Sequence, residues 1–261
     1  LLERFSPARH HSTVAHDTNL LSVETEDASF LFRYFDGFLV FAFLLGHAEE
    51  DLTSLFDPRM RDLSRRDFPW LRRLWARNLV ASGQERQVAK LFSLGARLPA
   101  FFQEFPDARV IYLLRDPLSV IPSTLNLVSS VLDQRFGFWS LPEELRSRWV
   151  RRIVAGLVQL WVRFFEDLES GAIPRDKVLV VPFDRLMSDL DGVMAQVFAF
   201  VGVEADPEQL GLIAARSESQ RSYRSGHSYQ LERFGLTPED IRRDCAVVYE
   251  ALESGPRYPS A

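Results

Sequence analysis

The sequence predicts a helix-rich α/β fold built around a central parallel sheet. Two short apolar runs, residues 110–114 and 177–183, have the pattern of strands that are buried on both faces. Segments of helical length precede and follow each run, and strands that alternate with helices favour parallel pairing. The balance of 46% hydrophobic and 26% charged residues is typical of a globular protein and argues against disorder or a coiled coil.

Four elements are expected before the first of these strands. An apolar, aromatic stretch at residues 30–45 predicts a helix of about four turns, and a charged helical region follows at 57–82. Residues 87–92, QVAKLF, form a short candidate strand. Residues 98–105 read as a helix that Pro106 ends.

The remaining elements alternate in the same way. A helix over 117–132 follows the first strand, and a long helix over 142–169 leads toward the second. An amphipathic helix over 184–203 comes after that second strand. Residues 217–236 are polar and contain Gly and Ser, which indicates a long ordered loop of the kind that carries function.

Charge and cysteine usage exclude several classes of function. The formal net charge of −5 gives no general reason to expect nucleic acid as a partner. Cys245 is the single cysteine, so an intrachain disulfide and a cysteine zinc site are excluded, and a reducing, cytoplasmic compartment fits. No stretch reaches the ~18–20 apolar residues of a transmembrane helix. Among 31 basic residues the two lysines are Lys90 and Lys177, which suggests positions that need a compact ammonium group.

The most informative segment is FPDARVIYLLRDPLSVIPSTLNL, residues 105–127. A buried strand delivers Arg115 to its carboxyl end, where ligands of open α/β sheets bind. Asp116 and Pro117 suit the start of a helix, and Ser123 follows eight residues after Arg115, near the second turn. A guanidinium fork and a helix hydroxyl are suited to gripping a phosphate dianion. The alternative is that Arg115 caps a helix or pairs with an acid, and that Ser123 is an ordinary helical serine.

This segment as a whole resembles the adenosine 3′-phosphate-binding motif of sulfotransferases that use 3′-phosphoadenosine 5′-phosphosulfate (PAPS). The resemblance implies that Arg115 and Ser123 hold the 3′-phosphate of PAPS and that no metal is required. It further implies a single domain over residues 1–261, folded as a three-layer sandwich like that of P-loop NTPases. Within this family, the sequence most resembles the bacterial and tyrosylprotein sulfotransferase branch.

Lys90 matches a family lysine near the transferred sulfuryl group, although a surface lysine is the alternative. The family continues with Asn or Ser and then Pro, whereas this chain has Leu91, Phe92 and Ser93. Phe183 stands where the family's later strand–helix unit carries a Tyr, so the hydrogen bond of that hydroxyl is lost.

Two further groups of residues are assigned by resemblance alone. Residues 227–241 are similar to the C-terminal loop that closes over the donor, and the candidates in and before it are Arg221, Ser225, Gly226 and His227. The acidic cluster before residue 30 is similar to the stretch that supplies the catalytic base, with Glu26 the first choice, Glu24 the second and His16 the third. A solvated acidic turn is the alternative for that cluster.

The family also has an N-terminal strand, a loop of the Arg/Lys-Ser-Gly-Thr type and a helix, whose N–H groups hold the 5′-phosphosulfate. This pattern is not in the sequence, since Ser82-Gly83 and Ser225-Gly226 lie in the wrong context. Either the segment precedes Leu1, which the missing initial Met favours, or the protein is a degenerate member.

The expected reaction is therefore sulfuryl transfer from PAPS to a hydroxyl or amine. An inactive nucleotide- or partner-binding relative is the first alternative. An unrelated nucleotide enzyme such as a kinase is the second, although the G-x-x-x-x-G-K-[ST] motif is lacking. The Phe-rich segments 30–45 and 132–165 suit a small-molecule or lipid-like acceptor, and the second also suits a homodimer face. Core packing explains both equally well.

Overall fold

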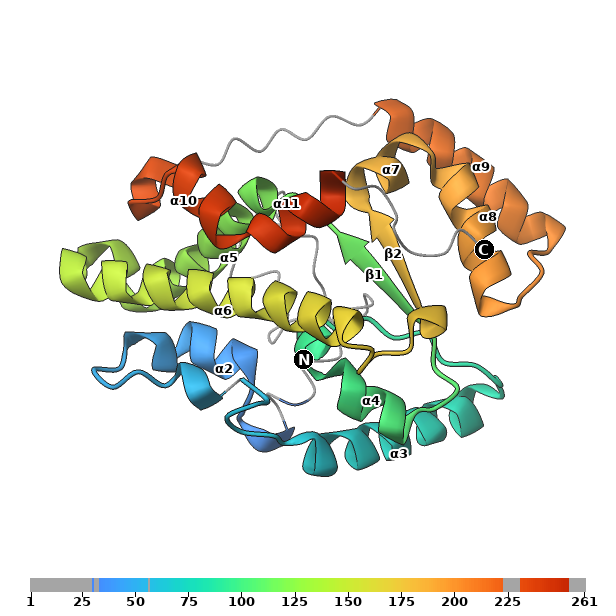
Figure 1. Cartoon of the computed structure of the whole chain (residues 1–261), viewed down its shortest axis with the longest axis horizontal. Helices are drawn as coiled ribbons and strands as arrows, with labels where there is room; N and C mark the ends of the chain where they lie inside the picture. Colours follow the sequence, from blue (N-terminus) through green and yellow to red (C-terminus); the bar gives the residue numbers. More distant parts are fainter. Residues whose placement is uncertain (1–29, 31–32, 56, 223–230, 254–261) are drawn as a thin grey trace.

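The computed structural model describes residues 30, 33–55, 57–222 and 231–253 of the 261-residue chain (Figure 1). It is rich in helix, with one small parallel sheet. The strands are β1 (Val110–Leu114) and β2 (Val178–Pro182). The helices of the described residues are α2 (Phe38–Phe43), α3 (Ser64–Ser82), α4 (Leu98–Glu104), α5 (Pro117–Phe136), α6 (Glu143–Glu169), α7 (Phe183–Ser188), α8 (Leu190–Val201), α9 (Pro207–Ser222), α10 (Pro238–Asp244) and α11 (Ala246–Glu253).

The two strands pair in parallel, as the sequence predicts. Val110 lies opposite Val178 and Leu114 opposite Pro182, so the carboxyl ends of both strands meet at one edge of the sheet. The chain returns from β1 to β2 through α5 and α6, because parallel strands need a long crossover connection. Within the described part of the chain the sheet has two strands.

The expectation that both strands are buried on both faces is correct for β2 and wrong for β1. Residues 178–181 are all buried. In β1 the side chains of Ile111 and Leu113 are 39% and 53% exposed, whereas Leu114 is buried. Because successive side chains of a strand point to opposite faces, β1 has one covered face and one open face within the described residues.

The main core is organised around α6. This helix crosses the molecule with α2, α3 and α4 on one side and α5, α10 and α11 on the other (Figure 1). Trp149 is fully buried, and its indole Nε1 donates to the carbonyl of Ala42 at 2.7 Å. The ring of Phe164 stacks on that of Tyr112 in β1, with centroids 3.6 Å apart. Core packing thus accounts for these aromatic residues of the 132–165 segment.

Three predicted elements in the first half of the chain need correction. The four-turn helix over 30–45 is interrupted, because Phe35 (φ 48°) and Gly37 (φ 92°) adopt left-handed backbone conformations, and α2 covers only Phe38–Phe43. Residues 87–92 form no strand. The charged helix begins at Ser64 rather than at residue 57, because the Asp62 carboxylate accepts from the Ser64 amide at 2.9 Å and holds a turn there.

The later elements agree more closely with the sequence. The helix over 117–132 is confirmed and extends to Phe136, where Gly137 (φ 67°) supplies the left-handed residue that ends it. The long helix over 142–169 is confirmed as α6. The loop expected over 217–236 is wrong at its start, since α9 continues to Ser222, and residues 223–230 lie outside the described residues.

Candidate functional site

The carboxyl edge of the sheet brings together the residues that follow the two strands. Arg115 comes directly after β1, and Phe183 comes directly after β2. The pairing of Leu114 with Pro182 places them side by side, and the Arg115 guanidinium carbon lies 4.5 Å from the centre of the Phe183 ring. The ring covers one face of the guanidinium through a cation–π contact, which leaves the in-plane N–H groups for another partner.

Arg115 has no competing partner in the described part of the chain. Its guanidinium makes no ion pair with a described carboxylate and no hydrogen bond to a described carbonyl. The alternative readings of Arg115, as a helix cap or the partner of an acid, therefore find no support there. A half-buried guanidinium without a described carboxylate partner is suited to bind an incoming anion.

Asp116 fixes the turn that carries Arg115. Its side chain caps α5 by accepting from the Leu118 amide at 2.9 Å, as the sequence predicts. The same oxygen accepts a hydrogen bond from the Tyr249 hydroxyl at 2.8 Å. Burial and this hydrogen bond raise the pKa of Tyr249 above its ordinary value, so the hydroxyl stays a donor.

Sequence reasoning missed Tyr249. It lies in α11, 133 residues after Asp116, and no motif marks it. The only local signal is the helical spacing of Cys245 and Val248, whose buried side chains fasten this part of the chain to the core.

Ser123 and Lys90 are two other predicted site residues that the structure describes. Ser123 is half-buried in the second turn of α5. Lys90 is exposed on the irregular segment that precedes the 3₁₀ helix Ser93–Arg97, rather than at the end of a strand. That 3₁₀ helix lies against β1, because a Cβ at Gly95 would be 3.2 Å from the Tyr112 ring.

Some predicted residues lie outside the described part of the chain. Arg221 belongs to the last turn of α9, but its side chain is not described. The other candidates, for the base and for the C-terminal loop, are outside the described residues altogether: His16, Glu24, Glu26, Ser225, Gly226 and His227.

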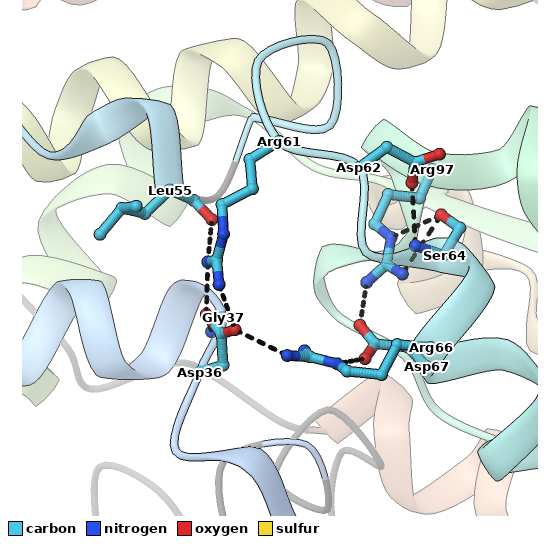
Figure 2. Close-up of polar contacts among 9 residues, drawn as sticks. All are labelled: Asp36, Gly37, Leu55, Arg61, Asp62, Ser64, Arg66, Asp67 and Arg97. Atoms are coloured by element: carbon cyan, nitrogen blue, oxygen red, sulfur yellow. Dashed lines mark hydrogen bonds and ion pairs between the residues drawn. The ribbon is translucent and has the colours of Figure 1, made fainter.

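A second cluster, not predicted from the sequence, lies between α2, α3 and the 3₁₀ helix at 93–97. The Asp36 carboxylate accepts from both terminal nitrogens of Arg61, at 2.9 Å each, and from Arg66 at 3.0 Å. Asp67 accepts from Arg66 Nε at 2.7 Å and from Arg97 Nη1 at 2.9 Å. Figure 2 shows the resulting chain Arg61–Asp36–Arg66–Asp67–Arg97, here called the ionic chain.

The ionic chain has a clear effect on titration. Burial raises the pKa of Asp36, but hydrogen bonds from Arg61, the Gly37 amide and Arg66 outweigh it, so this pKa lies below its ordinary value. Asp67 is only 2% exposed, and its paired arginines compensate the buried charge. The cluster borders a cavity of about 80 Å³, lined by Phe38, Leu39, Leu55, Phe92 and Leu160 together with the charged groups.

Two further observations concern the described residues as a whole. No helix among them combines the length and apolar character that crossing a membrane requires. No three of their His, Cys, Asp or Glu side chains gather in the manner of a metal site.

Comparison with known proteins bears on both the sequence and the fold. A family model described as "Sulfotransferase family" matches residues 12–207 of the 261-residue chain. The match includes β1, β2 and the Arg115–Ser123 segment but ends before α10 and α11. Comparison with curated protein sequences gives no match.

Among solved structures, the chain is similar to the crystal structure of sulfotransferase STF9 from Mycobacterium avium, with a TM-score of 0.59 and 18% sequence identity. The similarity covers 78% of this chain and 48% of that one, so the chain spans about half the length of its structural relative. At 18% sequence identity, this similarity is evidence for a shared fold.

Proposed function

The chain belongs to the sulfotransferase family, and we propose that it transfers a sulfuryl group from PAPS to a hydroxyl or amine of an acceptor molecule. The observation that carries the proposal is Arg115 at the carboxyl edge of the sheet, stacked on Phe183 and without a described anionic partner. This residue lies within the matched family region and within the segment that resembles the family's 3′-phosphate motif.

The nucleotide is held by the turn between β1 and α5. Arg115 donates two parallel N–H groups to the 3′-phosphate, and the Ser123 hydroxyl donates a third hydrogen bond. The Asp116 cap and the Tyr249 hydroxyl keep this turn in place, which supports a preformed rather than an induced phosphate site.

The transfer itself forms one bond and breaks another. The acceptor oxygen or nitrogen attacks the sulfur of PAPS in line with the leaving 5′-phosphate oxygen. The bond from sulfur to that oxygen breaks, and adenosine 3′,5′-bisphosphate leaves with the electron pair. A base takes the acceptor proton, so that positioning, charge neutralisation and proton transfer supply the catalysis.

The resemblance assigns the remaining roles. Lys90 neutralises charge that grows near the sulfuryl group, and Glu26, ahead of Glu24 and His16, is the base. The acceptor is a small or lipid-like molecule. The proposal places the enzyme in the cytoplasm, where its single cysteine remains reduced.

The test is a transfer assay with the complete encoded polypeptide, PAPS and a panel of hydroxyl and amine acceptors. We expect equal amounts of the bisphosphate and the sulfated acceptor, measured by mass spectrometry. Lys90→Ala should lower turnover far more than it lowers bisphosphate affinity. Glu26→Gln should lower turnover by about 10²–10⁴-fold and leave bisphosphate affinity near that of the unaltered protein. Lys177→Ala and Glu24→Gln are the matched controls. A protein that binds the bisphosphate but transfers sulfate to none of the panel contradicts the proposed activity.

A further inference from the structure

The cavity beside the ionic chain has more positive than negative charge on its walls. Among the described residues, its lining contains three arginines, Arg61, Arg66 and Arg97, and two aspartates, Asp36 and Asp67. The neighbouring exposed Asp62 interacts electrostatically with Arg97 and with the exposed Arg65. Counting Asp62 and Arg65 together with the lining leaves the excess of one guanidinium unchanged. A partly enclosed guanidinium excess favours an anion, since Coulomb attraction is stronger away from bulk water.

Arg66 retains a donor group for such an anion. Its Nε and Nη1 atoms donate to Asp67 and Asp36, whereas Nη2 has no hydrogen-bond acceptor among the described residues. The guanidinium lies over the Tyr34 ring, with its carbon 4.1 Å from the ring centre. Two salt bridges and this ring fix the orientation of the guanidinium. The Nη2 group is therefore preorganised to donate a hydrogen bond to a ligand.

The rest of the cavity is apolar and small. Phe38, Leu39, Leu55 and Leu160 form walls around the charged groups. A volume of about 80 Å³ holds a few waters or a carboxylate-sized group, not a whole lipid. The Phe92 side chain lines the cavity and is 44% exposed. Its ring centroid lies 5.5 Å from that of Phe38, so the apolar surface extends from the cavity toward solvent.

The backbone beside the cavity is strained. Asp36 lies between Phe35 (φ 48°) and Gly37 (φ 92°), and left-handed conformations of a bulky residue cost energy. Such strain concentrates at ligand sites. Here it turns the Asp36 carboxylate toward Arg61 and Arg66.

The cavity also lies close to the residue proposed to face the sulfuryl group. Phe92 and Ser93 line it, and they follow Lys90 by two and three residues. Two residues span at most about 7 Å, so the Lys90 backbone is within that distance of the Phe92 backbone.

Resting on the proposed function, we infer that this cavity is an acceptor subsite that binds a carboxylate, with Arg66 as the recognising group. The acceptor is accordingly an amphipathic carboxylic acid that also carries the hydroxyl or amine to be sulfated. Its carboxylate enters the cavity and its apolar body lies along Phe38 and Phe92.

The probes for this inference are octanoate and 1-octanol, which share an apolar body and differ in charge. Their affinities for the complete encoded polypeptide, measured by ligand-observed NMR at pH 7, should differ by about tenfold or more in favour of octanoate. Arg66→Gln should abolish the preference. The control Arg65→Gln removes the same charge from the adjacent exposed position of α3 and should leave the preference intact.

Two results would overturn the inference: equal affinities for the two probes in the unaltered protein, or an octanoate preference that survives Arg66→Gln. The first comparison needs no variant, so it stands even if Arg66→Gln unfolds. Bisphosphate affinity, measured in parallel, separates the two proposals. If the unaltered protein binds the bisphosphate but shows no octanoate preference, the subsite alone is refuted. If the unaltered protein does not bind the bisphosphate, the proposed function is refuted.

Discussion

Two regions of the molecule place an arginine over an aromatic ring, and they differ in what else the guanidinium contacts. At the sheet edge, Arg115 lies over Phe183 and has no described carboxylate partner. In the ionic chain, Arg66 lies over Tyr34 and is shared between Asp36 and Asp67. The first guanidinium is poised for an external anion, whereas most of the charge of the second is used to join α3 to the turn before α2. Substitutions should therefore affect nucleotide affinity in the first region. In the second region, substitutions of the two carboxylates should affect mainly folding stability.

The largest effect is expected for Asp67→Ala. This carboxylate is 2% exposed and accepts from both Arg66 and Arg97. Its removal leaves Arg97 without its ion-paired carboxylate and leaves Arg66 with Asp36 alone. The free energy of unfolding, measured by urea denaturation, should fall by about 3–5 kcal/mol. Asp107→Ala, at an exposed site, is the control and should cost far less. Equal losses in the two variants would show that the ionic chain is not a stabilising unit.

A smaller effect is expected for Asp36→Asn, and it should depend on pH. Because the pKa of Asp36 is lowered in the folded protein, its contribution is present above the unfolded carboxyl pKa and is lost as pH falls through the lower folded value. The stability difference between the variant and the unaltered protein should shrink progressively as pH falls below about 4, whereas at pH 7 the variant should be about 1–3 kcal/mol less stable. Thermal unfolding between pH 3 and pH 7 measures this. A stability difference that does not change with pH would contradict the assignment.

At the sheet edge the matching prediction is Tyr249→Phe. Loss of the hydroxyl removes one hydrogen bond to Asp116, which positions the turn without touching the ligand. Affinity for adenosine 3′,5′-bisphosphate should fall about 3–10-fold, while the unfolding midpoint should change little. A double-mutant cycle with Asp116→Asn should show coupling, since both residues act through the same oxygen. Additive effects would mean that Tyr249 does not act through Asp116.

The smallest effect is expected for Phe183→Leu. This change keeps an apolar side chain and removes the cation–π contact with Arg115, worth about 0.5–1 kcal/mol at a partly exposed site. Bisphosphate affinity, measured by calorimetry, should fall about 2–5-fold. Phe183→Tyr, which keeps the ring, should bind as well as the unaltered protein. A loss in Phe183→Tyr equal to that in Phe183→Leu would argue against the stacking role.

The two regions also differ in how far the sequence predicts them. The strand 110–114, the Asp116 cap and the helix after it depend on neighbouring residues, and the sequence predicts all three correctly. The ionic chain joins Asp36 to Arg66 and Asp67 to Arg97, pairs that are each 30 residues apart, and charge counting does not reveal such pairs. Tyr249 is likewise far from its partner Asp116 in the sequence, so no local pattern predicts that contact.

Two errors have local causes that the sequence only partly reveals. The break in the 30–45 helix depends on the left-handed conformation of Phe35, a residue type that rarely adopts it. The absent strand at 87–92 shows that a six-residue run cannot form a strand without a neighbour to pair with. The sulfotransferase resemblance itself rested on the local segment, and the family match confirms it.

The most direct test of the account is calorimetric titration of adenosine 3′,5′-bisphosphate into the unaltered protein, Arg115→Ala and Arg109→Ala. Arg109 precedes the amino end of the same strand, where it donates to the Asp176 carbonyl, and it serves as the matched control. Arg115→Ala should lose about 2–5 kcal/mol of binding free energy, because a charged bidentate contact to the phosphate disappears, while Arg109→Ala should bind as the unaltered protein does. Equal affinity in Arg115→Ala and the unaltered protein would contradict the assignment of the sheet edge as the nucleotide site.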